Sequence, residues 1–112
     1  MVKGIRNCQF FRDVVKDDGV LRTEVASANR VFSHAAVSNY DEENSVIVTL
    51  AHNEIGKGKP RPVHSVEVEP DGEFYFNPED FEFDIAAGEH VELHASAPGG
   101  GEVGLSILTY KS

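Results

Sequence analysis

The five histidines are the residues of this chain whose type and spacing could most readily support chemistry. His90 and His94 are four residues apart, a spacing that on a helix places two imidazoles on one face, where they can share a metal ion. They lie instead in an alternating, strand-like stretch, where they stand about 13 Å apart and cannot share one ion. Another metal site would have to join His34, His52 or His64 from different strands. We therefore expect no metal and no other cofactor, with His34 half-buried and the other histidines on polar faces or in loops.

Paired carboxylates are a second candidate for chemistry, because glycosidases place two carboxyl groups about 5–10 Å apart. In this chain the paired acids alternate with valine, phenylalanine or isoleucine. That alternation puts the acids on the solvated side of strands, where they favour solubility and protect sheet edges. We expect no catalysis from them. The pairs are Glu67 with Glu69, Glu79 with Asp80, and Glu82 with Asp84.

Nucleophilic catalysis finds no sequence support either. Cys8 is the only cysteine, so the chain can form neither an internal disulfide nor a cysteine-based zinc cluster. Phenylalanines follow it closely, which favours a packed, structural thiol. A G-x-S-x-G motif is absent, and "GKGK" lacks the G-K-[ST] ending of a phosphate-binding loop. We expect a protein that is not an enzyme.

Length and composition predict one domain spanning residues 1–112. Hydrophobic residues make up 40% of the chain and charged residues 26%, which is ordinary for a globular protein. The formal net charge of −9 argues against nucleic-acid and anionic-membrane partners, since both need a basic face. The sequence has no apolar run of about 18 residues and no N-terminal apolar stretch typical of a signal peptide. We expect synthesis and folding in the cytoplasm.

Short alternating stretches separated by turn residues run along the whole chain. Their spacing of roughly 8–12 residues is typical of an antiparallel sandwich or barrel. We predict an all-β, helix-free antiparallel β-sandwich or jelly roll of about eight or nine strands. A turn is expected at Asp18-Gly19, and residues 1–12 are expected as an extended N-terminal arm. The expected strands are residues 9–15, 20–25, 30–37, 45–52, 63–69, 73–77, 81–85, 90–96 and 103–110.

The basic residues are unusually concentrated in "IGKGKPRP" (55–62), which contains Lys57, Lys59 and Arg61. In contrast, residues 62–112 hold eleven acids and one lysine. Charge polarity of this kind usually concerns partners and not the fold. We expect the basic loop to contact an acidic partner; the alternative is a solvated loop that contacts nothing.

Several aromatic residues are candidates for the same interface. Phe10 and Phe11 are adjacent, so in a strand they point to opposite sides, and one of them needs a partner to cover it. Tyr75 belongs to a dense aromatic segment from which a ring could face outward as an interface anchor. The rings of that segment that we expect in the core are Phe74 and Phe76 on one face and Phe81 and Phe83 on another.

Three stretches carry a resemblance to a known class of proteins: "NCQFFRDVV" near the start, "SANRVFSHAAVSN" in the middle, and "FNPEDFEFDIAAGEHVELHASAPGGGEVGLSILTY" (76–110). The last has the form of the closing hairpins of small jelly-roll domains in tailed-phage virions. Over its full length the chain resembles the cement or decoration ("staple") proteins of short-tailed phages of the epsilon15 type.

The resemblance implies a structural role and transfers no catalytic residues. Many copies would lie on the capsid exterior and bridge subunits of the major capsid protein, with a dimer or trimer as the expected homo-oligomer. The basic loop and the N-terminal segment would be the docking elements. The alternatives are a carbohydrate- or receptor-binding β-sandwich of the tail-fibre type, for which the platform would have to use Tyr40, Tyr75, Tyr110 or a phenylalanine, and a metal-dependent enzyme of the cupin type.

Overall fold

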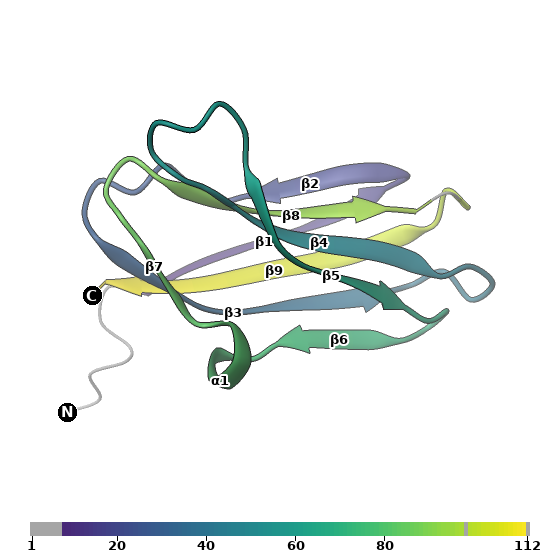
Figure 1. The fold of residues 1–112 in the computed structure, drawn as a ribbon. Helices are drawn as coiled ribbons and strands as arrows, with labels where there is room; N and C mark the ends of the chain where they lie inside the picture. Colours follow the sequence, from purple (N-terminus) through teal and green to yellow (C-terminus); the bar gives the residue numbers. More distant parts are fainter. Residues whose placement is uncertain (1–7, 98, 112) are drawn as a thin grey trace.

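The computed structural model describes residues 8–97 and 99–111. These residues form nine strands and one short helix, arranged as a flattened sandwich (Figure 1). The strands are β1 (Cys8–Lys16), β2 (Asp18–Arg22), β3 (Arg30–Asn39), β4 (Val46–Asn53), β5 (Arg61–Val68), β6 (Glu73–Phe76), β7 (Phe83–Ile85), β8 (His90–Ser96) and β9 (Glu102–Lys111), and the helix is α1 (Pro78–Phe81).

The strands pair into two sheets, and every pairing is antiparallel. The first sheet has the order β1-β9-β3-β6, with β7 also paired to β3, and the second sheet has the order β2-β8-β4-β5. The pairs β1–β9, β2–β8, β3–β6 and β4–β5 are nested along the chain, as if one long hairpin had been rolled over two sheets. This is the jelly roll, so the predicted all-β fold is confirmed.

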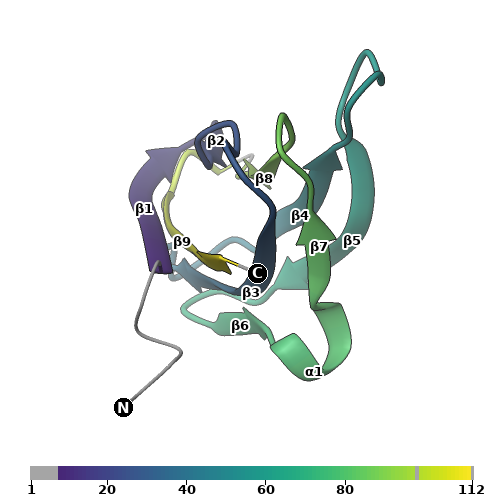
Figure 2. The same cartoon turned by 90° about the vertical axis from the view of Figure 1, so that its left-hand side faces the viewer.

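One core fills the space between the sheets (Figure 2). It forms because alternate residues of each strand are apolar and face inward. In β4, for example, Val46, Val48 and Leu50 are buried while Ile47 between them is exposed. The largest side chains with almost no exposure are Phe32, Phe76, Leu50, Leu93 and Ile107.

The prediction of a helix-free chain is wrong at one place, the four-residue helix α1. It interrupts the stretch between β6 and β7, both of which pair with β3. Pro78 has the fixed φ that suits a first helical residue, and Asn77 precedes it in extended conformation. The turn brings Phe81 onto the core, with its ring 5.2 Å from that of Phe76. Packing of one aromatic ring, and not helical periodicity, explains this element.

The chain reverses one residue earlier than predicted. Asp17 has a positive φ of 55°, while Asp18 and Gly19 already belong to β2. Glycine is needed at 19 for close packing and not for the turn, because a Cβ there would lie 2.4 Å from the Cβ of Val15.

The segment expected as an N-terminal arm divides in two. Residues 8–12 form the first part of β1, where Cys8 pairs with Tyr110 and Arg12 with Ser106 of β9. Residues 1–7 lie outside the described residues. Cys8 is half-buried at the start of the strand.

Candidate functional site

The outer face of the first sheet exposes large apolar side chains. Phe10 and Val14 project from β1 and Tyr75 from β6, and Tyr40 directly follows β3; their exposed fractions are 57%, 51%, 52% and 57%. Phe10, Val14 and Tyr75 each precede or follow a strand residue that packs on the core, so they point away from it, and Tyr40 lies against Gly104 on the same face. We call this surface the apolar face.

Small residues form the middle of the apolar face. Ser106 of β9 lies between Arg12 of β1 and Ala36 of β3, and Ala36 in turn lies beside Tyr75. Gly104 is a neighbour on the same face, where a Cβ would come within 3.0 Å of the Tyr40 ring. The glycine therefore lets the Tyr40 ring lie close against the sheet. The result is a shallow trough of small residues between aromatic side chains.

The apolar face brings together two of the predicted interface residues. Phe10 lies on β1 and Tyr75 on β6, at opposite edges of the four-strand path β1-β9-β3-β6. Three strand spacings separate these edges, which is about 14 Å. Phe11 points the other way and packs against the core, as its position next to Phe10 predicts.

The hydroxyl of Tyr75 donates a hydrogen bond to Glu73 on the same strand. This hydrogen bond and the negative charge of Glu73 raise the pKa of Tyr75 above its ordinary value. The phenol therefore stays neutral at physiological pH, with its ring exposed on the apolar face.

The three predicted basic residues lie elsewhere, in and just after the loop between β4 and β5 (Figure 2). Lys57 and Lys59 are exposed, and neither forms an ion pair within residues 8–97 and 99–111. Arg61 begins β5 and places its Nε 2.6 Å from Oε1 of Glu54. The basic loop and the N-terminal segment were predicted as two docking elements, and the structure places the basic loop at the second sheet, apart from the apolar face on the first.

A buried carboxylate anchors the basic loop, and sequence reasoning missed it. Glu89 accepts hydrogen bonds from the backbone N–H groups of Ile55 (3.1 Å) and Ala86 (2.9 Å) and lies 2.9 Å from Nε2 of His52. Burial by itself raises the pKa of Glu89, but these hydrogen bonds and His52 outweigh burial and hold the pKa below its ordinary value. His52 is itself buried, so its predicted position on a polar face or in a loop is wrong.

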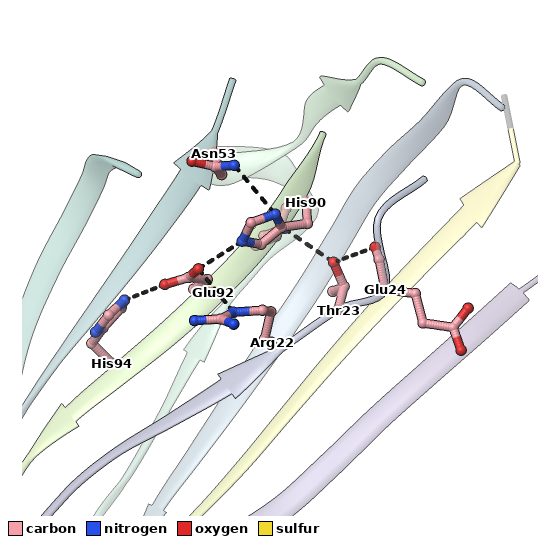
Figure 3. Close-up of polar contacts among 8 residues, drawn as sticks. Arg22, Thr23, Glu24, Asn53, His90, Glu92 and His94 are labelled. Atoms are coloured by element: carbon pink, nitrogen blue, oxygen red, sulfur yellow. Dashed lines mark hydrogen bonds and ion pairs between the residues drawn. The ribbon is translucent and has the colours of Figure 1, made fainter. Parts of the chain in front are cut away.

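A second buried carboxylate, Glu92, lies on the outward side of β8 (Figure 3). Nε of Arg22 is 3.0 Å from Oε2, and Nε2 of His90 is 2.6 Å from the same oxygen. Nε2 of His94 is 2.5 Å from Oε1. We call Arg22, His90, Glu92 and His94 the Glu92 cluster. Asn53 extends it, with Nδ2 3.4 Å from Nδ1 of His90.

The Glu92 cluster neutralises a buried negative charge. Burial alone raises the pKa of Glu92, but the hydrogen bonds from His90 and His94 and the charge of Arg22 lower it overall. Both carboxylate oxygens accept hydrogen bonds from side chains of the cluster. Within the described ranges 8–97 and 99–111, no group of three or more His, Cys, Asp or Glu side chains is placed to hold a metal ion.

The signal for this cluster was present in the alternation H-V-E-L-H of residues 90–94. Two-residue periodicity puts His90, Glu92 and His94 on one side of a strand, with the carboxylate between the two imidazoles. The distance between the histidines excluded a shared ion, but a carboxylate can accept a hydrogen bond from each. The six paired acids singled out from the sequence are all exposed, and the two buried acids were not among them.

Comparison with known proteins identifies the fold alone. No family model matches the chain, and no curated protein matches it. Among solved structures, a chain of the cowpea mosaic virus top component, a naturally occurring empty particle, matches with TM-score 0.53 and 7% identity over 99% of this chain and 85% of that chain. A chain of the empty virus-like particle of the same virus matches with the same TM-score and identity.

The crystal structure of PirA also matches, with TM-score 0.53, 11% identity and coverage of 95% of this chain and 94% of that chain. The jelly roll is thus shared with chains of viral particles and with PirA. No helix in the described part of the chain is long and apolar enough to cross a membrane.

Proposed function

We propose that this chain is a non-enzymatic structural virion protein that decorates the exterior of a tailed-phage capsid and bridges subunits of the major capsid protein. The apolar face carries this proposal. Within residues 8–97 and 99–111 it is an exposed sheet surface with aromatic side chains at both edges and small residues in the middle. Aromatic anchors around a flat, closely approachable centre are typical of protein interfaces.

The partner chemistry follows from that surface. Phe10 and Tyr75 would enter apolar pockets of two neighbouring capsid subunits, because they lie at opposite edges of the sheet. Small residues such as Ser106 and Ala36 would let the capsid surface approach the backbone between them. The jelly-roll fold shared with chains of a plant virus particle and the sequence resemblance to phage cement proteins support a role in a virion.

Binding to capsid shells tests the proposal. Shells assembled from the major capsid protein of an epsilon15-like phage are mixed with the purified chain and sedimented, and the dissociation constant is measured. We expect the doubly substituted variant Phe10→Asp/Tyr75→Asp to bind about 100-fold more weakly, because each lost aromatic anchor commonly costs more than 1 kcal/mol. The wild-type chain should also raise the temperature at which the shells disassemble.

Ile47→Asp is the matched control. Ile47 is 51% exposed, much like Phe10, but it projects from the second sheet. This variant should bind shells like the wild type. A wild-type chain that stays in the supernatant, or a double variant that sediments as well as the wild type, would refute the proposal.

A carbohydrate-binding function is the second candidate, and the Tyr40 ring favours it. Tyr40 borders a shallow recess of about 150 Å³ that Arg12, Ser38 and Ser106 also line. A sugar ring stacked on the phenol could accept and donate hydrogen bonds there. Chemical-shift changes centred on Tyr40 during titration with host surface oligosaccharides, without shell binding, would select this function over the first.

A further inference from the structure

Opposite charges lie at the two ends of strand β4. The loop before the strand contains Asp41, Glu42 and Glu43, and the loop after it contains Lys57 and Lys59 (Figure 1). Eight strand residues separate the two loops, which is about 23 Å at the rise of a β-strand. The loops therefore cannot meet within one molecule, but they can meet between two molecules.

The acidic loop is held in one conformation. Oδ1 of Asp41 accepts hydrogen bonds from the N–H groups of Glu43 (2.8 Å) and Asn44 (3.1 Å), and these bonds lower the pKa of Asp41. The buried Asn39 side chain donates to the carbonyl of Asn44 at 2.9 Å. Glu42 and Glu43 are exposed and form no ion pair within the described part of the chain.

A cationic recess lies beside the basic loop, on the outer face of the second sheet. It has a volume of about 560 Å³ and is lined by Arg22, Lys59, His94, Pro60, Pro62 and Ala51, among others. Arg22 uses only its Nε to bind Glu92, and its terminal nitrogens form no hydrogen bond within residues 8–97 and 99–111. Figure 3 shows the guanidinium lying beside the Glu92 carboxylate.

The recess is positively charged although it contains a carboxylate. Glu92 and Arg22 offset each other, and Lys59 adds a further positive charge at the rim. Pro60 and Pro62 limit the freedom of the loop that carries Lys59, so less conformational entropy is lost when Lys59 binds an anion. The Arg22 guanidinium is already held by its Nε bond to Glu92, so its terminal nitrogens are placed to donate to an incoming carboxylate.

We infer that this recess binds the acidic loop of a second copy of the chain, with the Glu42 and Glu43 carboxylates accepting hydrogen bonds from Arg22 and Lys59. The inferred contact is head-to-tail: the acidic loop of one copy occupies the recess of the next. Such a contact leaves one recess and one loop free on each pair, and repeated contacts close into a ring or extend as a chain. The inference stands independently of the proposed capsid role.

Charge reversal tests the contact, with the dissociation constant of self-association measured by sedimentation velocity over a wide concentration range. We expect Lys59→Glu to weaken association at least tenfold, and Glu42→Lys/Glu43→Lys to do the same. Lys57→Glu is the matched control, since Lys57 is exposed in the same loop but does not line the recess. Arg22 is left intact because its loss would leave Glu92 poorly compensated.

Mixing the two defective variants gives the decisive result. The unchanged acidic loop of the Lys59→Glu chain can bind the unchanged recess of the Glu42→Lys/Glu43→Lys chain. A one-to-one mixture should therefore form heterodimers with nearly the wild-type dissociation constant. Their association should weaken as salt is added. A wild-type chain that stays monomeric, a Lys57→Glu variant as defective as Lys59→Glu, or a mixture no better than its components would overturn the inference.

Discussion

The outer faces of the two sheets differ in the kind of side chain that they expose or bury. The first sheet exposes Phe10 and Tyr75 around small residues and buries no charged side chain among them. The second sheet buries the charged Glu92 and surrounds it with Arg22 and two histidines. The exposed rings of the first face therefore contribute little to the stability of the isolated molecule. Their burial becomes favourable only when a partner covers them. The second face contributes to the stability of the isolated molecule.

The two kinds of group lose their contact with water at different steps, one on binding and the other on folding. An exposed aromatic ring on a sheet gives up contact with water only on binding. A buried carboxylate has already lost its hydration on folding, and hydrogen bonds within the same molecule must replace it. Substitutions of the buried Glu92 should therefore affect folding, whereas substitutions of Phe10 and Tyr75 should affect binding.

The largest expected effect on folding comes from Glu92→Ala. This change leaves three donor side chains without their acceptor and opens a cavity on β8. Breaking a buried ion pair commonly costs about 3–5 kcal/mol, but solvent screens the Arg22 partner, whose side chain is 61% exposed. We expect a loss of about 2 kcal/mol in the free energy of unfolding, measured by urea denaturation.

Glu67→Ala is the control for that change. Glu67 is also a strand glutamate on the second sheet, but it is exposed and pairs with Ile47. Its removal should change the free energy of unfolding by less than about 0.5 kcal/mol. Equal losses for the two glutamates would mean that the Glu92 cluster does not stabilise the fold.

A smaller, pH-dependent effect should distinguish Glu92→Gln from the wild type. The pKa of Glu92 in the folded chain lies below its ordinary value of 4.5. The ionised carboxylate thus stabilises the fold above pH 4.5, and this stabilisation is lost as the pH falls through the folded-state pKa. We expect Glu92→Gln to lower the free energy of unfolding by about 1 kcal/mol at pH 7 and by progressively less toward pH 3. A difference that stays constant with pH would contradict the assigned role of the charge.

The alternation of apolar and polar residues predicted the strands because each sheet has one face toward the core and one face toward solvent. The residues 90–96 expected as a strand are β8 without change, and Phe10 and Phe11 diverge as expected. The same reasoning could not find Glu89 or Glu92. Periodicity assigns a residue to a face, but the burial of that face depends on side chains and loops from distant parts of the chain, such as Arg22 and Ile55.

The other differences between expectation and structure also come from tertiary packing. The helix α1 is too short to show a periodic pattern, and the core contact of Phe81 stabilises it. Gly19 was assigned to a turn, although its lack of a side chain serves the close approach of β2 to Val15. The predicted interface residues remain untested by the fold, since exposure shows where a partner can bind but not which partner does.

The smallest expected effect on folding comes from substitutions of the exposed rings on the first sheet. It tests most directly whether these rings serve binding and not folding. Phe10→Ser/Tyr75→Ser removes two large rings, yet more than half of each residue is already exposed in the folded chain. We expect the free energy of unfolding to fall by less than about 1 kcal/mol for each substitution, because less than half of each residue is buried in the folded chain. Urea denaturation of the double variant and of Phe11→Ser measures both free energies of unfolding. The Phe11 ring packs against the core. Phe11→Ser should be clearly destabilised, and a double variant that loses as much stability would show that the exposed rings serve the fold and not a partner.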